Sequence, residues 1–82
     1  MTQCLMFKSN PQHTNARYYR LEILTNLFEE FSVLREWGTQ GGKGRQVINL
    51  FPDLMSASHA ADRLREDKLR KGYQRAGELR AN

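Results

Sequence analysis

The stretch FSVLREWGTQGGKGRQVINLF, residues 31–51, holds two apolar segments on either side of a glycine-rich loop. The first segment alternates and so places two sets of side chains on opposite faces of a strand: Phe31, Val33, Arg35 and Trp37 against Ser32, Leu34 and Glu36. Residues 45–51 are rich in β-branched and aromatic residues, which favour strands. Because a loop as short as residues 38–44 favours antiparallel neighbours, the stretch predicts a β-hairpin.

Two further strands are predicted before this hairpin. The segment YYRLEIL, residues 18–24, alternates with Tyr19, Leu21 and Ile23 on one face, and CLMF at residues 4–7 is a short apolar segment. Turn-forming residues fill the connection at residues 9–16, and a short turn occupies residues 25–30. Connections this short favour antiparallel neighbours, so the sequence predicts an antiparallel sheet of about four strands.

A change of period after Pro52 predicts one helix. Asp53 is suited to the N-cap position, and Gly72 to the left-handed position that ends a helix. Residues between them form one stripe at spacings of three and four: Leu54, Ala57, Ala61, Leu64 and the stem of Lys68. We expect an α+β domain over residues 1–73, with this C-terminal helix packed on one face of the sheet, and a flexible basic tail over residues 74–82. One helix covers one face, so a partly apolar second face should stay open to a partner.

Length and composition limit the class of protein. The 82 residues suffice for one small domain, and a 39% hydrophobic and 27% charged content is ordinary for a folded domain. No stretch approaches the roughly 20 apolar residues of a membrane helix, and no signal-peptide pattern begins the chain. We therefore expect a cytoplasmic protein without membrane contact. Residues 68–82 contain five lysine or arginine residues and one acidic residue, Glu78, so this segment alone has a net charge of +4, which is also the net charge of the whole chain. Such a basic segment can bind nucleic acid, and it is also common on helices that are simply exposed to solvent.

Residues that usually carry catalysis or bind metals are sparse. The single cysteine, Cys4, lies in an apolar segment, where we expect a small buried hydrophobic residue. His13 and His59 have no cysteine or second histidine at a metal-ligand spacing. The glycine loop precedes a strand, whereas a phosphate-binding loop precedes a helix. We expect no enzymatic activity, no metal site and no cofactor.

The only tryptophan, Trp37, stands beside the glycine loop and allows two interpretations. A tryptophan face can stack on a base or sugar, Lys43 and Arg45 can reach phosphates, and the glycines permit positive φ and close approach of a ligand. The second interpretation is structural, because glycines build tight hairpins and the lone tryptophan of a small protein is usually a core residue.

The order of these features resembles the WGR domain family, which is named for a Trp-Gly-Arg motif. Its strand ends in a pattern like R-x-W-G-R-x-G-x-x-G-Q, and its helix closes on a lysine, two positions, a basic residue, glycine and an aromatic. The resemblance covers about residues 4–73 and is closest to small stand-alone bacterial members. It implies an antiparallel sheet packed on one helix. In poly(ADP-ribose) polymerases this domain binds DNA near a strand break, with the tryptophan against the terminal sugar and the arginine near the backbone.

Carried over residue by residue, the motif gives Trp37 and Gly38, and Gly41 and Gly44 match the later glycines. The helix end matches at Lys68, Lys71, Gly72 and Tyr73. Thr39 stands where the family has its arginine, Gln40 replaces a usually aliphatic residue, and Arg45 stands where glutamine is common. Loss of the arginine should weaken DNA binding about ten- to a hundredfold unless Lys43 or Arg45 compensates.

Two hypotheses of function follow. The first is a non-enzymatic nucleic-acid-binding module, for DNA above RNA, whose contacts come from the hairpin and the helix end: Arg35, Trp37, Gly38, Thr39, Lys43, Arg45, Lys68, Lys71 and Tyr73. The second is a protein-interaction or self-association module that uses the uncovered sheet face and makes no direct DNA contact. The missing arginine at Thr39 motivates the second hypothesis.

Overall fold

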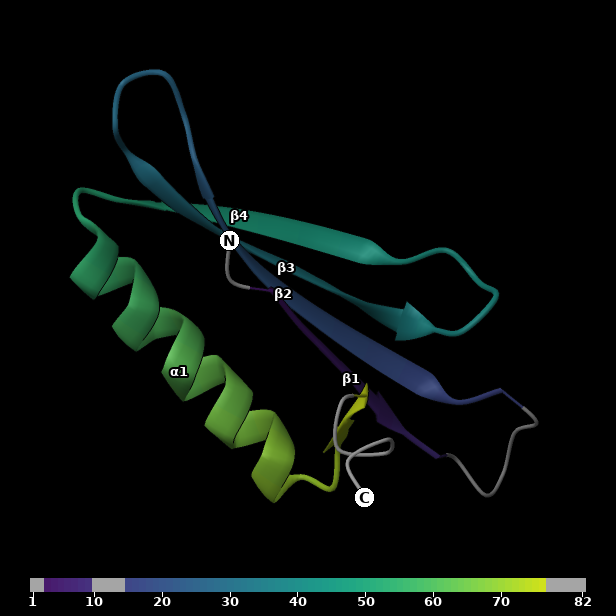
Figure 1. Cartoon of the computed structure of the whole chain (residues 1–82). Coiled ribbons are helices and arrows are strands. Elements are labelled where there is room, and N and C mark those ends of the chain that lie inside the picture. Colours follow the sequence, from purple (N-terminus) through teal and green to yellow (C-terminus); the bar gives the residue numbers. More distant parts are fainter. Residues whose placement is uncertain (1–2, 10–14, 77–82) are drawn as a thin grey trace.

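Five strands and one helix form from residues 3–9 and 15–76, the part of the chain that the computed structural model describes (Figure 1). Their order along the chain is β1 Gln3–Lys8, β2 Arg17–Thr25, β3 Phe31–Thr39, β4 Arg45–Phe51, α1 Leu54–Arg70 and β5 Gln74–Arg75. The strands make one antiparallel sheet in the order β4-β3-β2-β1-β5. The predicted α+β class is confirmed.

The fifth strand was not predicted. Gln74 and Arg75 pair with Phe7 and Met6 of β1, although their segment carries no apolar stripe. Two residues are too few to show an alternating pattern of apolar and polar side chains. Their pairing with β1 follows from the position at which the chain leaves the helix. His13 and residues 77–82 of the expected tail lie outside the described residues.

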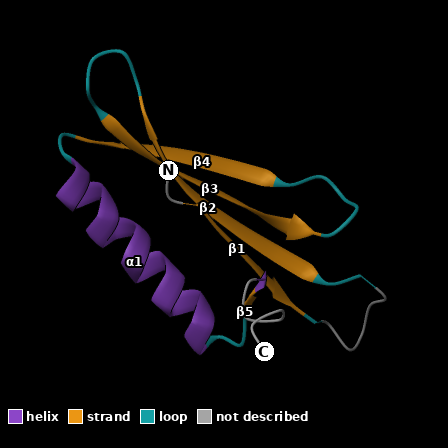
Figure 2. Cartoon of the chain, in the orientation of Figure 1, coloured by secondary structure: helices purple, strands orange, loops and turns teal. Residues whose placement is uncertain are grey.

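Helix α1 lies across one face of the sheet, and no described element covers the other face (Figure 2). The predicted alternation is confirmed, because Tyr19, Leu21 and Ile23 are all buried under the helix. The rest of the buried core comes from the neighbouring strands and the small residues of the helix: Met6, Val33, Ala57 and Ala61. The alanines let the helix backbone approach the sheet closely.

The helix ends follow the predicted chemistry. Asp53 Oδ1 accepts a hydrogen bond of 2.7 Å from the backbone N–H of Ser56. At the other end Gly72 adopts φ +100°, and the backbone N–H of Tyr73 donates to the carbonyl of Lys68, as in a Schellman motif. One prediction for the helix is wrong: Leu54 is 49% exposed, because it lies in the first turn, beyond the buried stretch of the stripe.

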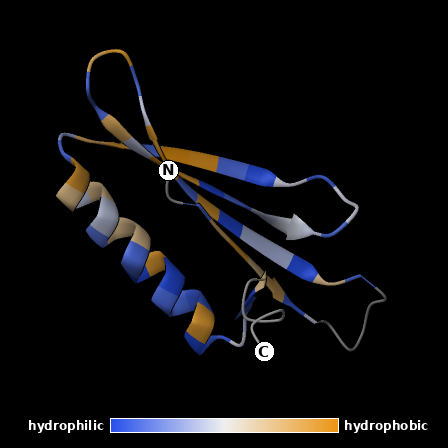
Figure 3. Cartoon of the chain, in the orientation of Figure 1, coloured by the Kyte–Doolittle hydropathy of each residue, from blue (hydrophilic) through white to orange (hydrophobic). Residues whose placement is uncertain are grey.

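The uncovered face is partly apolar, as predicted. Ile48 and Leu50 of the edge strand β4 are 57% and 64% exposed, whereas Leu34 on the adjacent strand is buried. In Figure 3 the end of β4 next to the β3–β4 hairpin is hydrophilic, and its other half is mostly hydrophobic. The only helix among the described residues is too short and too polar to cross a bilayer.

Candidate nucleic-acid interface

Three aromatic rings gather where the end of β3 meets the last turn of the helix. Tyr19 is buried at the centre, with its ring centroid 6.4 Å from that of Trp37 and 6.2 Å from that of Tyr73. Alternation places Tyr19 and Trp37 on the helix-facing side as a cross-strand pair, and the Schellman turn after Gly72 brings Tyr73 back to them. Trp37 is half-buried and packs against the core, so the structural interpretation of this residue holds in part.

Cations lie over these rings. Lys68 Nζ is 4.7 Å from the ring centroid of Tyr19 and 5.8 Å from that of Tyr73. The Arg35 guanidinium is 5.8 Å from the ring centroid of Trp37, and Lys8 Nζ is the same distance from that of Tyr73. At such distances the electron-rich face of an aromatic ring attracts a cation.

A cavity of about 310 Å³ opens beside Trp37, and we call it the Trp37 cavity. Its lining combines aromatic, cationic and apolar side chains: Tyr19, Arg35, Trp37, Leu64, Asp67 and Lys68. Tyr19 Oη and Arg35 Nε are buried. Neither makes a hydrogen bond of good geometry among the described residues, although the Arg35 side chain lies close enough to Tyr19 Oη to offset part of the rise in its pKa that burial causes.

The side chains around this cavity include several cations that repel one another and one carboxylate, Asp67. Burial lowers the pKa of Lys68, and the like charges of Lys71, Arg17 and Arg35 lower that pKa further, against the opposing effect of Asp67. Asp67 is paired with Lys71 at 3.1 Å. Burial likewise raises the pKa of Tyr19, which the nearby Arg35 guanidinium partly offsets, so the phenol stays neutral and able to donate.

The β3–β4 hairpin has structural reasons for its glycines. A Cβ at Gly38 would lie 3.1 Å from Gly44 Cα, and one at Gly44 would overlap Tyr18 Oη. Of the hairpin glycines only Gly41 has a positive φ, +87°, so the conformation that glycine permits is adopted there and not at Gly38, Gly42 or Gly44. Close packing against Tyr18 explains why position 44 is a glycine.

A hydrogen-bonded cluster on the uncovered face holds Tyr18 in this position. Glu36 accepts hydrogen bonds from Tyr18 Oη at 2.7 Å and from Arg20 Nη2 at 2.6 Å, and Arg20 also pairs with Glu22 at 2.8 Å. Hydrogen bonds from Arg20, Tyr18 and Gln46 lower the pKa of Glu36 from 4.5 to about 2. The cluster ties β2 to β3 and β4 and thereby sets the hairpin beside Trp37.

This cluster predicts a pH dependence of stability. Because the folded protein holds the Glu36 pKa low, its stabilising effect is complete above pH 4.5 and is lost as the pH falls toward 2. Urea unfolding at pH 6 and pH 3 should show a larger loss of stability for the wild type than for Glu36→Gln. Equal losses in the two proteins would contradict this role for Glu36.

The structure brings together four of the predicted site residues: Arg35, Trp37, Lys68 and Tyr73. Arg45 pairs with Trp37 in the register of β3 and β4, and so shares its face, whereas Gly38 points to the other face. Thr39 and Lys43 are exposed at the hairpin, and Lys71 is exposed in its pair with Asp67. None of these three residues takes part in the ring–ring or cation–ring contacts of the described structure.

Sequence reasoning missed Tyr19 and Arg17 as site residues. Arg17 pairs with Thr39 across β2 and β3, and the pair shares a face with Trp37. No ion pair of Arg17 is found within the described part of the chain. The alternation of β2 could have indicated its face, but the register that sets it opposite Thr39 could not be derived from one sequence.

Comparison with known proteins supports the resemblance. The profile of the WGR domain matches residues 2–80. A protein of Sinorhizobium fredii with the name "Uncharacterized protein y4dW" is 34% identical over 65 residues, which are 79% of this chain and 32% of that protein. The chain thus spans about a third of the length of this bacterial relative. The match over nearly all residues, together with the sheet, the helix and the Trp-Gly hairpin, shows that the chain belongs to the WGR domain family.

Proposed function

We propose that this domain is a non-enzymatic nucleic-acid-binding module that prefers DNA and works in the cytoplasm. Membership of the WGR family supports the general class of nucleic-acid binding. In the proposed complex the exposed part of Trp37 stacks on the sugar or base at a strand end. Arg35, Lys68, Arg45 and Arg17 contact the neighbouring phosphates, with Lys43 and Lys71 on the rim.

The observation that carries this proposal is the crowding of like charges over an aromatic cluster. Lys68 lies over two tyrosine rings, and its pKa is lowered by burial and by three neighbouring cations, Lys71, Arg17 and Arg35. Their repulsion is a cost in the free protein that a bound polyanion would relieve.

DNA binding should depend steeply on salt. With four phosphates neutralised by Arg17, Arg35, Arg45 and Lys68, log Kd should rise by roughly three to four for each tenfold increase in salt. Fluorescence anisotropy with blunt, nicked and single-stranded DNA, from low to moderate salt, measures this slope. Absence of binding to all three DNAs at low salt would refute the proposal.

Two helix variants distinguish binding at the proposed site from binding through the net charge of the protein. Lys68→Gln should reduce the slope by about one, because one phosphate contact is lost. Arg65→Gln is the matched control, since Arg65 lies on the same helix but is paired with Asp62 at 2.8 Å. An equal effect of both variants would mean that the protein binds only through its net charge.

The alternative is self-association or protein binding through the uncovered face. Ile48 and Leu50 favour it, because they are exposed apolar residues on the edge strand β4, whose outer side pairs with no strand of the described residues. A dimer that resists salt and is disrupted by Ile48→Ser, in a protein that does not bind DNA, would establish this function in place of the first. Light scattering after size-exclusion chromatography measures the mass.

A further inference from the structure

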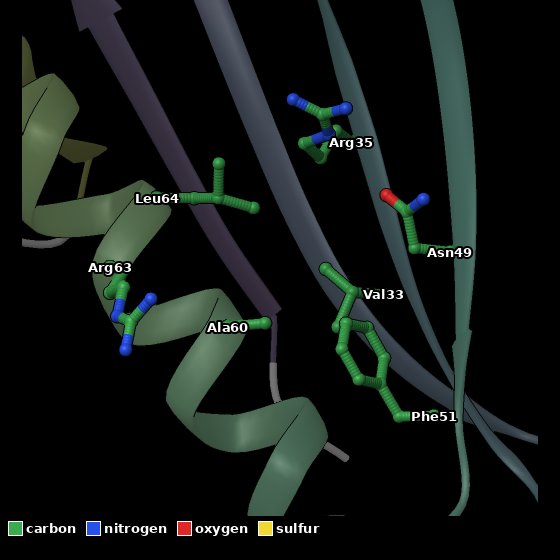
Figure 4. Close-up of a pocket in the computed structure, with 7 residues that line it drawn as sticks. All are labelled: Val33, Arg35, Asn49, Phe51, Ala60, Arg63 and Leu64. Atoms are coloured by element: carbon green, nitrogen blue, oxygen red, sulfur yellow. The ribbon is translucent and has the colours of Figure 1, made fainter.

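A second cavity of about 290 Å³ lies between helix α1 and strands β3 and β4, and Figure 4 shows its lining. Val33 and Phe51 from the sheet, with Leu64 from the helix, make it mainly apolar. Arg35 and Asn49 project from the strands into the gap, and Arg63 borders it on the helix (Figure 4). We call it the Asn49 cavity.

The two cavities are adjacent, because Arg35 and Leu64 line both of them. Along β3 the helix-facing residues Trp37, Arg35 and Val33 follow at intervals of two residues, about 6.6 Å apart. A ligand chain that passes Trp37 can therefore place its next unit over Arg35 and into the Asn49 cavity.

The chemistry of the Asn49 cavity suits a planar heterocycle. The Phe51 ring, half-buried against Val33, offers an aromatic face, and bases of every kind stack on such faces. The Asn49 carboxamide is exposed, and none of its hydrogen-bonding groups has a partner among the described residues. A carboxamide can pair with the polar edge of a base, since it carries both donors and an acceptor. No acidic side chain lines the cavity within the described structure.

From these observations we propose that the Asn49 cavity binds the base of one unpaired nucleotide next to the strand end held at Trp37. In this arrangement Phe51 stacks on the base, Asn49 contacts its edge, and Arg35 binds the phosphate between the two cavities. The proposal rests on the proposed function and names its preferred ligand: a duplex end with an unpaired nucleotide. A paired base at a blunt end is held in its own stack and cannot enter a gap between helix and sheet.

A series of DNA hairpins with the same duplex tests this preference. One ends blunt, others carry one unpaired nucleotide on the 5′ or the 3′ strand, and matched ones carry an abasic residue in its place. We expect one overhang to bind about tenfold more tightly than the blunt and abasic ends. With 2-aminopurine as the overhanging base, its fluorescence should change on binding, because the base moves to Phe51.

Variants then assign the preference to the cavity. Asn49→Ala should reduce the preference for the overhang, whereas Leu50→Ala, on the opposite face of the same strand, should keep it. Equal Kd values for blunt, overhanging and abasic ends would overturn the inference and leave the proposed function standing. A preference that survives Asn49→Ala and shows no 2-aminopurine signal would overturn it too. Failure to bind any of these DNAs would refute both proposals.

Discussion

Gly44→Ala should lower the free energy of unfolding by about 1–3 kcal/mol, the usual cost of overpacking. The added Cβ would overlap Tyr18 Oη and lie 2.9 Å from Glu36 Oε2 and 3.3 Å from the carbonyl oxygen of Trp37. Either the hairpin moves away from the sheet, or the hydrogen bond between Tyr18 and Glu36 breaks. For a domain of this size the melting temperature should fall by roughly 4–8 °C for each kcal/mol.

Gly42→Ala is the matched control in the same hairpin. A Cβ there meets nothing closer than the carbonyl oxygen of Thr39, at 3.4 Å, which is ordinary contact. Its effect should stay within about 0.5 kcal/mol. Urea unfolding followed by circular dichroism measures both variants, and a Gly44→Ala protein as stable as Gly42→Ala would contradict the packing role.

A double-mutant cycle identifies the atom responsible. Tyr18→Phe removes the hydroxyl that the new Cβ would overlap, so it should cost less in the Gly44→Ala background than in the parent. If the two changes are additive, the clash lies elsewhere in the hairpin.

These glycines show what a single sequence can and cannot predict. Residues 31–51 predict a hairpin, because alternation and loop length are local properties. Position 44 requires a glycine because the hydroxyl of Tyr18 lies against it. Tyr18 is 26 positions away along the chain, and only the pairing of β2 with β3 brings the two residues together. The sequence predicts the loop and shows that its glycines permit positive φ, which the structure has only at Gly41 among them.

The same limit applies to the site. Arg35, Trp37 and Lys68 were found because each lies in a motif or at a helix end. Tyr19 and Arg17 were missed, since their roles come from cross-strand neighbours. Helix limits were predictable from Asp53 and Gly72, whose side-chain and backbone chemistry is local. Strand β5 depends on where the chain leaves the helix and had no local signal.

The register of β2 and β3 makes Arg17 the residue whose substitution should weaken DNA binding most. Arg17 lies opposite Thr39, and directly paired residues on one face of a sheet have Cβ atoms about 5 Å apart. Arg17 is near enough to Lys68 to lower its pKa and has no ion pair within the described structure. It can therefore supply the charge that position 39 lacks. Arg17→Thr should weaken DNA binding about ten- to a hundredfold.

Moving the arginine across the strand pair tests that explanation. The double variant Arg17→Thr/Thr39→Arg keeps the composition and net charge of the protein, and it returns a guanidinium to the same face from the neighbouring strand. It should regain most of the affinity lost in Arg17→Thr, and Thr39→Arg alone should bind more tightly than the wild type. Anisotropy titrations at one salt concentration compare the four proteins.

The outcome decides between two accounts of the substituted motif. If the swap restores binding, what the site requires is one cation beside Trp37, and either strand can provide it. If Arg17→Thr binds as the wild type does, Arg17 is a solvated residue. The interface then depends on Arg35, Arg45 and Lys68. If Thr39→Arg also changes nothing, this end of the hairpin lies outside the contact, and the uncovered face with Ile48 and Leu50 becomes the better candidate for the functional surface.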